Sequence, residues 1–453
     1  MPEYPFIWDI VFVVVAMPIL EAVILRHNYR IISPMTMFII ACFVLYVLPY
    51  LSHFYLVPNR RMNMLSYGQF ALAFNTLRCF LYTYCLVAIP LLVRLSKRKG
   101  SIMVLDSAQV NMLSIVVLLL FIPILILNLG IGIGFSPAAM LDRAFNPRAY
   151  TYIRIGLGPL HHLHIGLTFV LLALASARIF TSNKSIGSIV FFILCTFVSI
   201  IGGDKRSFVV PLIMFTIVWQ KMSWADRSVF QRLRKTLFVC TIVGFVIILS
   251  FSLWFEPGEV VGLRDAASMV VQYHREAFYL PLVIEHFSWE PRYLWETIID
   301  TIIFPVPRAI WTSKPAYIGM WGRYFRPEFE PETVYYHTST FGCLSEAHLL
   351  FSWFGPFIYG IVWALIGYKL YIYLISHDNL FKACLVGVLV FWTYMLERTG
   401  FWGVNTSTVL MYVMIAWLPL RKAKSVWYEE IENEEYPLPE LSEESTMMDS
   451  YDT

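Results

Sequence analysis

Long apolar runs recur along almost the whole chain and are separated by short polar segments. A run of about 20 apolar residues is long enough to cross the hydrocarbon core of a bilayer as a helix. The pattern therefore predicts an all-α polytopic membrane protein with about 11 transmembrane helices. We place these helices at residues 6–25, 32–57, 68–95, 111–134, 152–180, 187–203, 207–220, 236–255, 351–373, 380–396 and 401–420.

One polar segment, at residues 256–340, is much longer than the others. Within it, residues 269–287 and 295–303 carry apolar positions at helical spacing, and prolines break the rest into turns. We expect a large loop with amphipathic helices that lie on the membrane surface or cap a cavity.

The chain then divides into four parts: an N-terminal transmembrane bundle (1–255), the large loop (256–340), C-terminal transmembrane helices (341–420) and an acidic tail (421–453). The tail is low in complexity and is expected to be disordered.

Basic residues in short loops predict the orientation, because Lys and Arg are retained on the cytoplasmic side of a membrane. The clusters at 94–99, 221–235 and 421–424 all fall on one side if the N-terminus is outside. The large loop is then on the outer side and the C-terminus is cytoplasmic. We expect a multi-pass membrane protein.

The composition agrees with lipid as part of the solvent. Hydrophobic residues make up 58% of the chain, charged residues make up 14%, and the mean hydropathy is +0.64. A water-soluble domain of this length could not bury so much apolar surface in one core. The net charge of +3 is too small to indicate nucleic-acid binding.

The turn at residues 202–207, with the sequence GGDKRS, joins two apolar runs that are short for full crossings. The turn can therefore sit in a protein-lined cavity below the outer surface. Arg206, next to Lys205, would lie at the positive N-terminal end of the following helix, an arrangement that favours an anion. The alternative is an ordinary hairpin turn with two basic residues at the lipid headgroups.

Polar residues also lie inside the predicted spans. With a rise of 1.5 Å per residue, Arg78 in the third span and His161, His162 and His164 in the fifth lie about 15 Å deep, just below Arg154. A charge at that depth is usually kept for a function and faces the bundle interior or a wet cavity. The histidines can equally be core residues paired with the backbone. No Cys or acid lies near them in sequence, so we predict no metal site.

The large loop contains two runs in which aromatic and basic residues alternate. Tyr273 and Arg275 belong to the first run, and Arg308 and Lys314 flank Trp311 in the second. Aromatic faces stack on sugar rings, and Arg side chains grip phosphate or carboxylate groups. Packing within the loop explains each run about as well.

Two candidate bases lie between the large loop and the ninth predicted span. A neutral His337 or an ionised Glu346 at a membrane mouth can remove a proton from a sugar hydroxyl. Glu346 could also be a buried structural acid paired with an arginine. Arg398 marks a later outer turn close to the same face.

Four segments resemble the oligosaccharide repeat-unit polymerase (O-antigen polymerase, Wzy-type) family: GGDKRSFVVPLIMF, PVPRAIWTSKP, HTSTFGCLSEAHLLFSWFG and LERTGF. The family carries a G-G-x-R or G-x-R turn, a P-R-x-x-W-x-x-K-P stretch, a Gly and an acid ahead of a span, and a late Arg-x-Gly turn at the corresponding places. The resemblance covers the second half of the chain. The first four spans match only in hydropathy.

The resemblance implies that a growing glycan is transferred from undecaprenyl diphosphate to an incoming lipid-linked repeat unit at the periplasmic face. The product would be O-antigen of lipopolysaccharide or a related surface polysaccharide. No metal or other cofactor is implied, because preorganised arginines can stabilise the diphosphate leaving group. Expected partners are the undecaprenyl-diphosphate-linked oligosaccharide, membrane lipid, a flippase and a chain-length regulator, but not nucleic acid.

Residue roles follow from the same resemblance. Arg206 would stabilise the leaving diphosphate, and His337 or Glu346 would activate the acceptor hydroxyl. Substrate-binding roles are expected for the following residues: Lys205, Arg275, Arg308, Lys314, Arg398, Arg78, Arg154 and Tyr273.

Two other functions remain open at this stage. O-antigen ligases share the overall plan, but their His motif has Asn, Ser or Gln next and a Gly at a set distance, whereas Thr338 follows His337 here and His348 stands at the Gly position. A flippase or other transporter of lipid-linked sugars also needs polar groups at mid-membrane depth. A carrier has no evident need for a long one-sided loop, and the sequence shows no halves with matching hydropathy.

Overall fold

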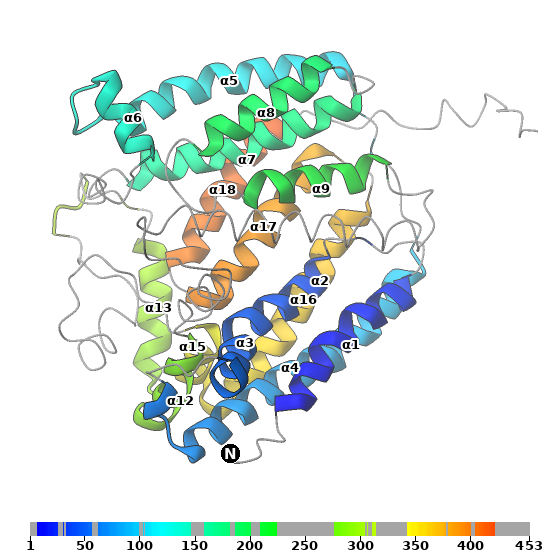
Figure 1. Ribbon diagram of the computed structural model, residues 1–453, viewed down its shortest axis with the longest axis vertical. Helices are drawn as coiled ribbons and strands as arrows, with labels where there is room; N and C mark the ends of the chain where they lie inside the picture. Colours follow the sequence, from blue (N-terminus) through cyan, green and yellow to red (C-terminus); the bar gives the residue numbers. More distant parts are fainter. Residues whose placement is uncertain are drawn as a thin grey trace, which may run out of the picture.

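The computed structural model describes the following residues: 7–25, 30, 33–56, 62–98, 103, 105–145, 158–181, 186–200, 209–223, 276–303, 306, 310–313, 342–376, 379–399 and 404–421. Every regular element in this part of the chain is a helix (Figure 1). Their bounds are α1 (Ile7–Leu25), α2 (Pro34–Cys42), η2 (Phe43–Val47), α3 (Leu48–Leu51), η3 (Ser52–Leu56), η4 (Met62–Met64), α4 (Tyr67–Ser96), α5 (Ser107–Gly130), α6 (Pro137–Phe145), α7 (Gly158–Thr181), α8 (Ile186–Ile200), α9 (Val209–Ser223), α12 (Glu276–His286), α13 (Pro291–Ile303), α15 (Cys343–Phe351), η8 (Ser352–Phe354), α16 (Gly355–Ile375), α17 (Leu380–Thr399) and α18 (Val404–Leu420).

Six of the helical stretches are long and apolar enough to cross a membrane. They are Ile7–Leu25, Pro34–Tyr55, Tyr67–Ser96, Ser107–Gly130, Leu160–Thr181 and Cys343–Ile375. Four shorter apolar helices accompany them: Ile186–Val198, Val210–Met222, Leu380–Thr393 and Thr408–Leu420. The prediction of an α-helical membrane protein is confirmed, whereas the total of about 11 crossings stays a prediction. The span predicted at 236–255 lies outside the described residues.

Local capping explains where the predicted spans begin. Ser66 and Gln69 form a reciprocal capping box at the start of α4: the Gln69 backbone N–H donates to Ser66 Oγ at 3.3 Å, and the Ser66 N–H donates to Gln69 Oε1 at 2.8 Å. Ser33 caps α2 by accepting from the Met35 and Thr36 N–H groups with its side chain. Such caps satisfy backbone donors that the helix leaves open.

The ninth predicted span differs most from its prediction. Hydropathy predicts a start at residue 351, but helix α15 already begins at Cys343 and meets α16 through a short 3₁₀ turn. Ser352 adopts φ 55° at this junction, which breaks the helix. The eight residues that precede the predicted start are helical because they are buried against neighbouring helices, which hydropathy alone does not register.

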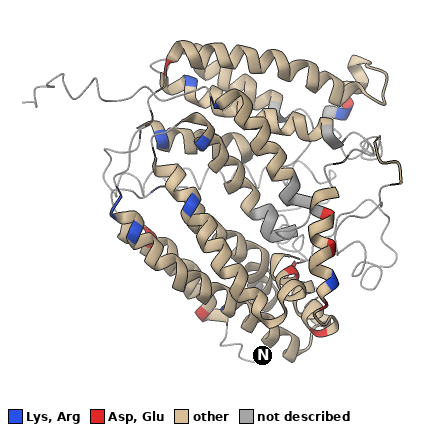
Figure 2. Ribbon diagram, turned by 180° about the vertical axis from the view of Figure 1, so that it is seen from behind, with Lys and Arg blue, Asp and Glu red and all other residues tan. Residues whose placement is uncertain are grey.

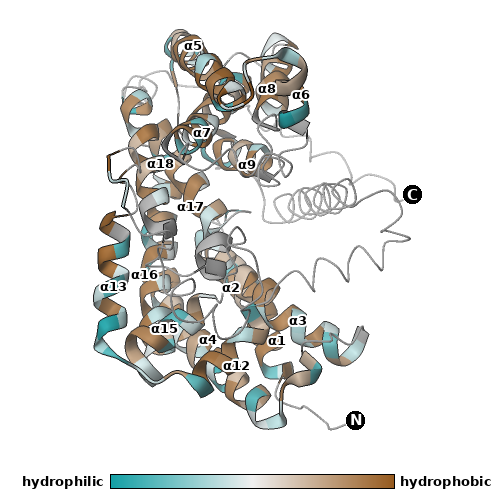
Figure 3. Cartoon of the chain, turned by 90° about the vertical axis from the view of Figure 1, so that its left-hand side faces the viewer, coloured by the Kyte–Doolittle hydropathy of each residue, from teal (hydrophilic) through white to brown (hydrophobic). Residues whose placement is uncertain are grey.

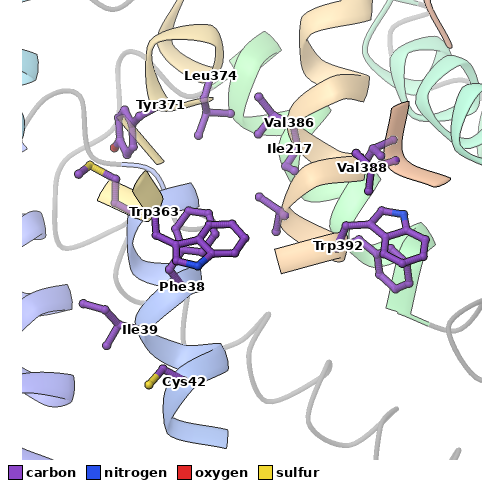
Figure 4. Close-up of a cluster of buried hydrophobic side chains, with 14 of the residues drawn as sticks. Phe38, Ile39, Cys42, Ile217, Trp363, Tyr371, Leu374, Val386, Val388 and Trp392 are labelled. Atoms are coloured by element: carbon purple, nitrogen blue, oxygen red, sulfur yellow. The ribbon is translucent and has the colours of Figure 1, made fainter. Parts of the chain in front are cut away.

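The core forms where helices distant in sequence pack together. Helix α16 lies along α4 and α2, and α17 contacts α2, α7, α9 and α18. Phe38 of α2 and Trp363 of α16 pack with their ring centroids 4.4 Å apart. Figure 4 shows them in one cluster of buried side chains with Ile217 of α9 and Val386 and Trp392 of α17. Helix α17 thereby connects α2 with α7, α9 and α18.

The bundle has one end that is rich in cations. Lys221 Nζ donates to the Ser376 carbonyl at 2.8 Å, and the Arg30 N–H donates to the Tyr371 hydroxyl at 3.1 Å, so α9 and α16 end together beside the α1–α2 connection. Lys382, at the start of α17, lies over the Tyr373 ring. Figure 2 shows Lys and Arg residues gathered at this cation-rich end.

The opposite end carries α12 and α13. The Tyr50 hydroxyl donates to the Ala277 carbonyl at 2.5 Å, and Gln69 hydrogen-bonds the Glu285 carboxylate, so α12 lies against the far ends of the α2–η3 segment and α4. We call this the α12 end of the bundle. The helices expected near 269–287 and 295–303 are confirmed where they are described, and they lie away from the cation-rich end.

Candidate functional site

Two helices at the α12 end of the bundle carry a buried acidic residue in their first turn. Glu276 in the first turn of α12 is 0% exposed, and Glu346 in the first turn of α15 is 3% exposed. Charged groups are costly to bury in a membrane protein and mark functional sites by default. We therefore take the residues around them as the candidate site, and define it as Glu276, Glu346, Tyr46, Tyr359 and Ser345.

Glu346 has a hydroxyl partner and a favourable helix position. The Tyr359 hydroxyl donates to Glu346 Oε2 at 3.1 Å, and the Glu346 N–H donates to the Gly342 carbonyl at 3.1 Å. The first turn of a helix favours negative charge because the open N–H groups and the helix dipole point there. A carboxylate held in this way can accept a proton from a bound hydroxyl, which is the chemistry of a general base.

Tyr46 brings the start of α15 and the start of α12 together. Its hydroxyl accepts a hydrogen bond from the Leu344 N–H at 3.4 Å. A Cβ at Gly342 would meet both Tyr46 and Glu276, so Tyr46 also lies close to Glu276. The η2 turn thus holds both acid-bearing helices from the side of the transmembrane bundle.

Further polar groups lie along α15. Ser345 is fully buried, and its Oγ has no hydrogen-bond partner in the part of the chain that the structure describes. His348 is hydrogen-bonded to the Phe287 backbone, and its ring meets Trp353 edge-on with centroids 5.4 Å apart. Helix α15 therefore places a hydroxyl, a carboxylate and an imidazole within two turns on the buried side of the α12 end.

Gly342 allows this close approach. Its φ of 87° lies in the left-handed region that favours glycine, and a Cβ added there would collide with the Tyr46 hydroxyl and come within 3.3 Å of Glu276 Cβ. We expect Gly342→Ala to lower the free energy of unfolding by roughly 1–3 kcal/mol, the usual cost of such backbone strain. Thermal unfolding of the purified protein measures this change.

Gly187→Ala is the matched control, because a Cβ at Gly187 meets nothing within 4 Å. An unfolding temperature for Gly342→Ala equal to that of the control would show that Tyr46 and α15 are not held as the structure places them.

Arg78, which the sequence marks as a substrate-binding candidate, lies between α1 and α4. Its Nε and a terminal nitrogen donate to the Asp9 carboxylate at 2.7 and 3.2 Å, and the Tyr82 hydroxyl donates to the same carboxylate at 2.9 Å. The structure therefore gives Arg78 an intramolecular partner that holds α1 against α4. A role in substrate binding stays a prediction.

The structure does not describe the side chains of the remaining predicted site residues. Arg398 belongs to the last turn of α17, where only the backbone is described. The others lie outside the described residues: Arg206, Lys205, Arg154, Tyr273, Arg275, Arg308, Lys314 and His337.

The histidines of α7 have partners inside the bundle. His162 Nδ1 lies 3.0 Å from the Tyr412 hydroxyl of α18, and the buried His164 has its Nδ1 3.4 Å from Asn128 Nδ2 of α5. These contacts favour the interpretation as core residues for both side chains. Among the described residues, no group of three or more His, Cys, Asp or Glu side chains is placed to hold a metal ion.

Sequence reasoning missed Tyr46 and Tyr359. Both are single tyrosines inside apolar runs, and nothing in the local pattern separates them from the other aromatic residues of the spans. Glu276 follows Arg275 in the large loop, and nothing in the sequence separates it from the other charged residues there. A comparison of the chain with protein-family models, with curated proteins and with solved structures finds no match.

Proposed function

We propose that this chain polymerises lipid-linked oligosaccharide repeat units, transferring a growing glycan from undecaprenyl diphosphate to an incoming lipid-linked unit. The observation that carries the proposal is the buried Glu346 carboxylate, held by Tyr359 at the α12 end of the bundle. Transfer of a sugar to a hydroxyl needs a group that removes the hydroxyl proton. Glu346 can remove that proton, and it lies at the end of the bundle that also carries α12 and α13 of the large loop.

The diphosphate that leaves in this reaction develops negative charge. Fixed guanidinium groups can stabilise it, and the sequence offers Arg206, with Arg275, Arg308 and Arg398 as further candidates. Either His337 or Glu346 serves as the base, and the buried position of Glu346 favours the latter. Tyr359 then acts as a positioning residue, because it touches the carboxylate rather than the substrate.

The proposed setting is the bacterial inner membrane. In the part of the chain that the structure describes, Lys and Arg concentrate at the end of the bundle away from α12, and such residues are retained in the cytoplasm. This distribution supports a periplasmic α12 end and a cytoplasmic C-terminus. The lipid-linked unit would reach the site from the outer leaflet after a flippase has delivered it, and a chain-length regulator would act on the product.

The test in cells compares wild type with a chain that carries Glu346→Gln. An impaired polymerase leaves single repeat units on the outer leaflet and on the cell surface. A failed flippase traps the units inside, and a failed ligase leaves long polymers on the lipid carrier. Either of these last two patterns would overturn the proposal in favour of the corresponding function.

Polymerisation by the purified protein is expected to proceed unchanged in excess chelator. Arginine side chains supply the stabilisation of the leaving diphosphate that a bound metal would otherwise supply. The measurement is the rate of chain growth with and without chelator. A loss of activity that a divalent ion restores would contradict this prediction and would show that a metal ion takes part in the reaction.

A further inference from the structure

Helix α13 places its polar and apolar side chains in an unusual way. Tyr293, Thr297 and Asp300 are buried at 3%, 3% and 1% exposure, whereas three large apolar residues are exposed. The exposed residues are Trp295 at 62%, Ile299 at 49% and Ile302 at 69%. In a helix on the surface of a water-soluble protein the apolar face points inward, so the surroundings of α13 are not those of such a helix.

The two sets lie on opposite sides of the helix. Successive residues turn by about 100° in an α-helix, so Trp295, Ile299 and Ile302 form one stripe directed away from the buried set. We call these three residues the outer stripe. The buried side faces the protein through contacts of α13 with α15 and α18. The outer stripe therefore points away from the protein, toward the surroundings of the bundle at the α12 end.

Exposed aromatic residues mark the same end. Trp8 and Tyr55 pack with their centroids 5.9 Å apart where α1 begins and η3 ends, and both are exposed. Trp289, which precedes α13, and Trp353, which follows α15, are exposed as well. Trp and Tyr are enriched where the hydrocarbon core of a bilayer meets the headgroups. These residues indicate that the α12 end lies at a membrane–water boundary.

The outer stripe also has an apolar neighbour. Helix α18, which contacts α13, exposes Leu410, Met414 and Leu418, as a transmembrane helix facing lipid does. Figure 3 shows α13 at the rim of the molecule, with its hydrophobic residues toward the end nearest α18. Exposed apolar residues therefore lie on two helices that contact each other, α18 and α13.

We infer that α13 is an interfacial helix whose outer stripe inserts into the bilayer leaflet at the α12 end. The occupant of this surface is the bilayer lipid itself, at the boundary between headgroups and acyl chains. Amphipathic helices bind there through the burial of apolar side chains. A second copy of the chain or a partner protein would be a different occupant.

Helix α13 is connected to the candidate site through α15. Trp289 Nε1 donates to the Leu350 carbonyl at 2.8 Å, which fastens the α12–α13 connection to α15. Helix α15 carries Glu346. The depth at which α13 sits in the leaflet therefore sets the height of Glu346 relative to the lipid headgroups.

Two labelling reactions on the unmodified protein test this inference. The protein is placed in nanodiscs of phosphatidylcholine and phosphatidylglycerol, and some of the lipid carries a photoreactive diazirine on the acyl chain. Mass spectrometry then locates carbene adducts on the peptide that contains α13. In parallel, hydroxyl radicals generated in the water oxidise accessible side chains, and Trp295 is the reporter.

Insertion predicts adducts on the outer stripe, as on the exposed Phe12 of α1, together with a loss of Trp295 oxidation relative to the same protein unfolded in denaturant. Tyr293, on the buried side, should carry neither label. Oxidation of Trp295 without lipid adducts would place the stripe in water and overturn the inference. Absence of both labels would show that protein covers the stripe, which also overturns it.

Discussion

Glu346→Gln is expected to slow chain growth by roughly 10²–10⁴-fold, the usual contribution of a general acid or base. The amide keeps the size of the side chain and can still accept a hydrogen bond from Tyr359, but it cannot take up a proton. The rate of ladder formation from a lipid-linked oligosaccharide measures the effect. The Michaelis constant for the acceptor should change little, because the carboxylate acts on the proton rather than on binding.

Glu285→Gln is the matched control for this variant. Glu285 lies on the same end of the bundle, but it is exposed and hydrogen-bonds Gln69 rather than a residue of the candidate site. Tyr359→Phe should give an intermediate loss, because it removes the hydroxyl that positions the carboxylate. If folded Glu346→Gln polymerises at the wild-type rate, Glu346 is a structural acid and His337 becomes the base to examine.

Arg206→Lys should reduce chain growth on the order of 10²-fold, the effect of removing one preorganised donor from a site of developing charge. A lysine keeps the positive charge but cannot fork onto two phosphate oxygens as a guanidinium does. Glycan lengths on the cell surface and rates with purified protein both measure this loss. The expectation rests on the sequence, since residue 206 lies outside the described part of the chain.

Arg232→Lys makes the same chemical change in the basic cluster predicted on the cytoplasmic side, and it should leave chain lengths unchanged. A wild-type distribution of chain lengths in Arg206→Lys would remove the proposed contact with diphosphate. Equal losses in both variants would indicate a general effect on insertion or stability instead.

The helices could be predicted from the sequence where the information is local. The third span was expected at 68–95 and the helix runs Tyr67–Ser96, because an apolar run and the Ser66–Gln69 capping box both act over a few residues. The early start of α15 could not be predicted in this way. Ser345, Glu346 and His348 are polar, and they are buried because α12, α13, α16 and α17 pack against α15.

The candidate site was predictable only in part for the same reason. Glu346 stood out as an acid beside a span, but its surroundings come from elsewhere in the chain. Tyr46 reaches Leu344 from 298 positions away, and Arg78 pairs with Asp9 across 69 positions. Hydropathy and local spacing do not show which distant residues pair in the fold. A residue can therefore be singled out from the sequence while its partner is not. The pairing of Arg78 was missed in this way.

The central claim is that the α12 end of the bundle joins one lipid-linked oligosaccharide to another. The most direct measurement supplies the purified protein, reconstituted in lipid, with a defined undecaprenyl-diphosphate oligosaccharide and resolves the products by size. We expect a ladder of products that grows by whole repeat units and stops when undecaprenyl diphosphate is removed from the donor. Unchanged single units, or units moved across the bilayer without a new glycosidic bond, would contradict the account.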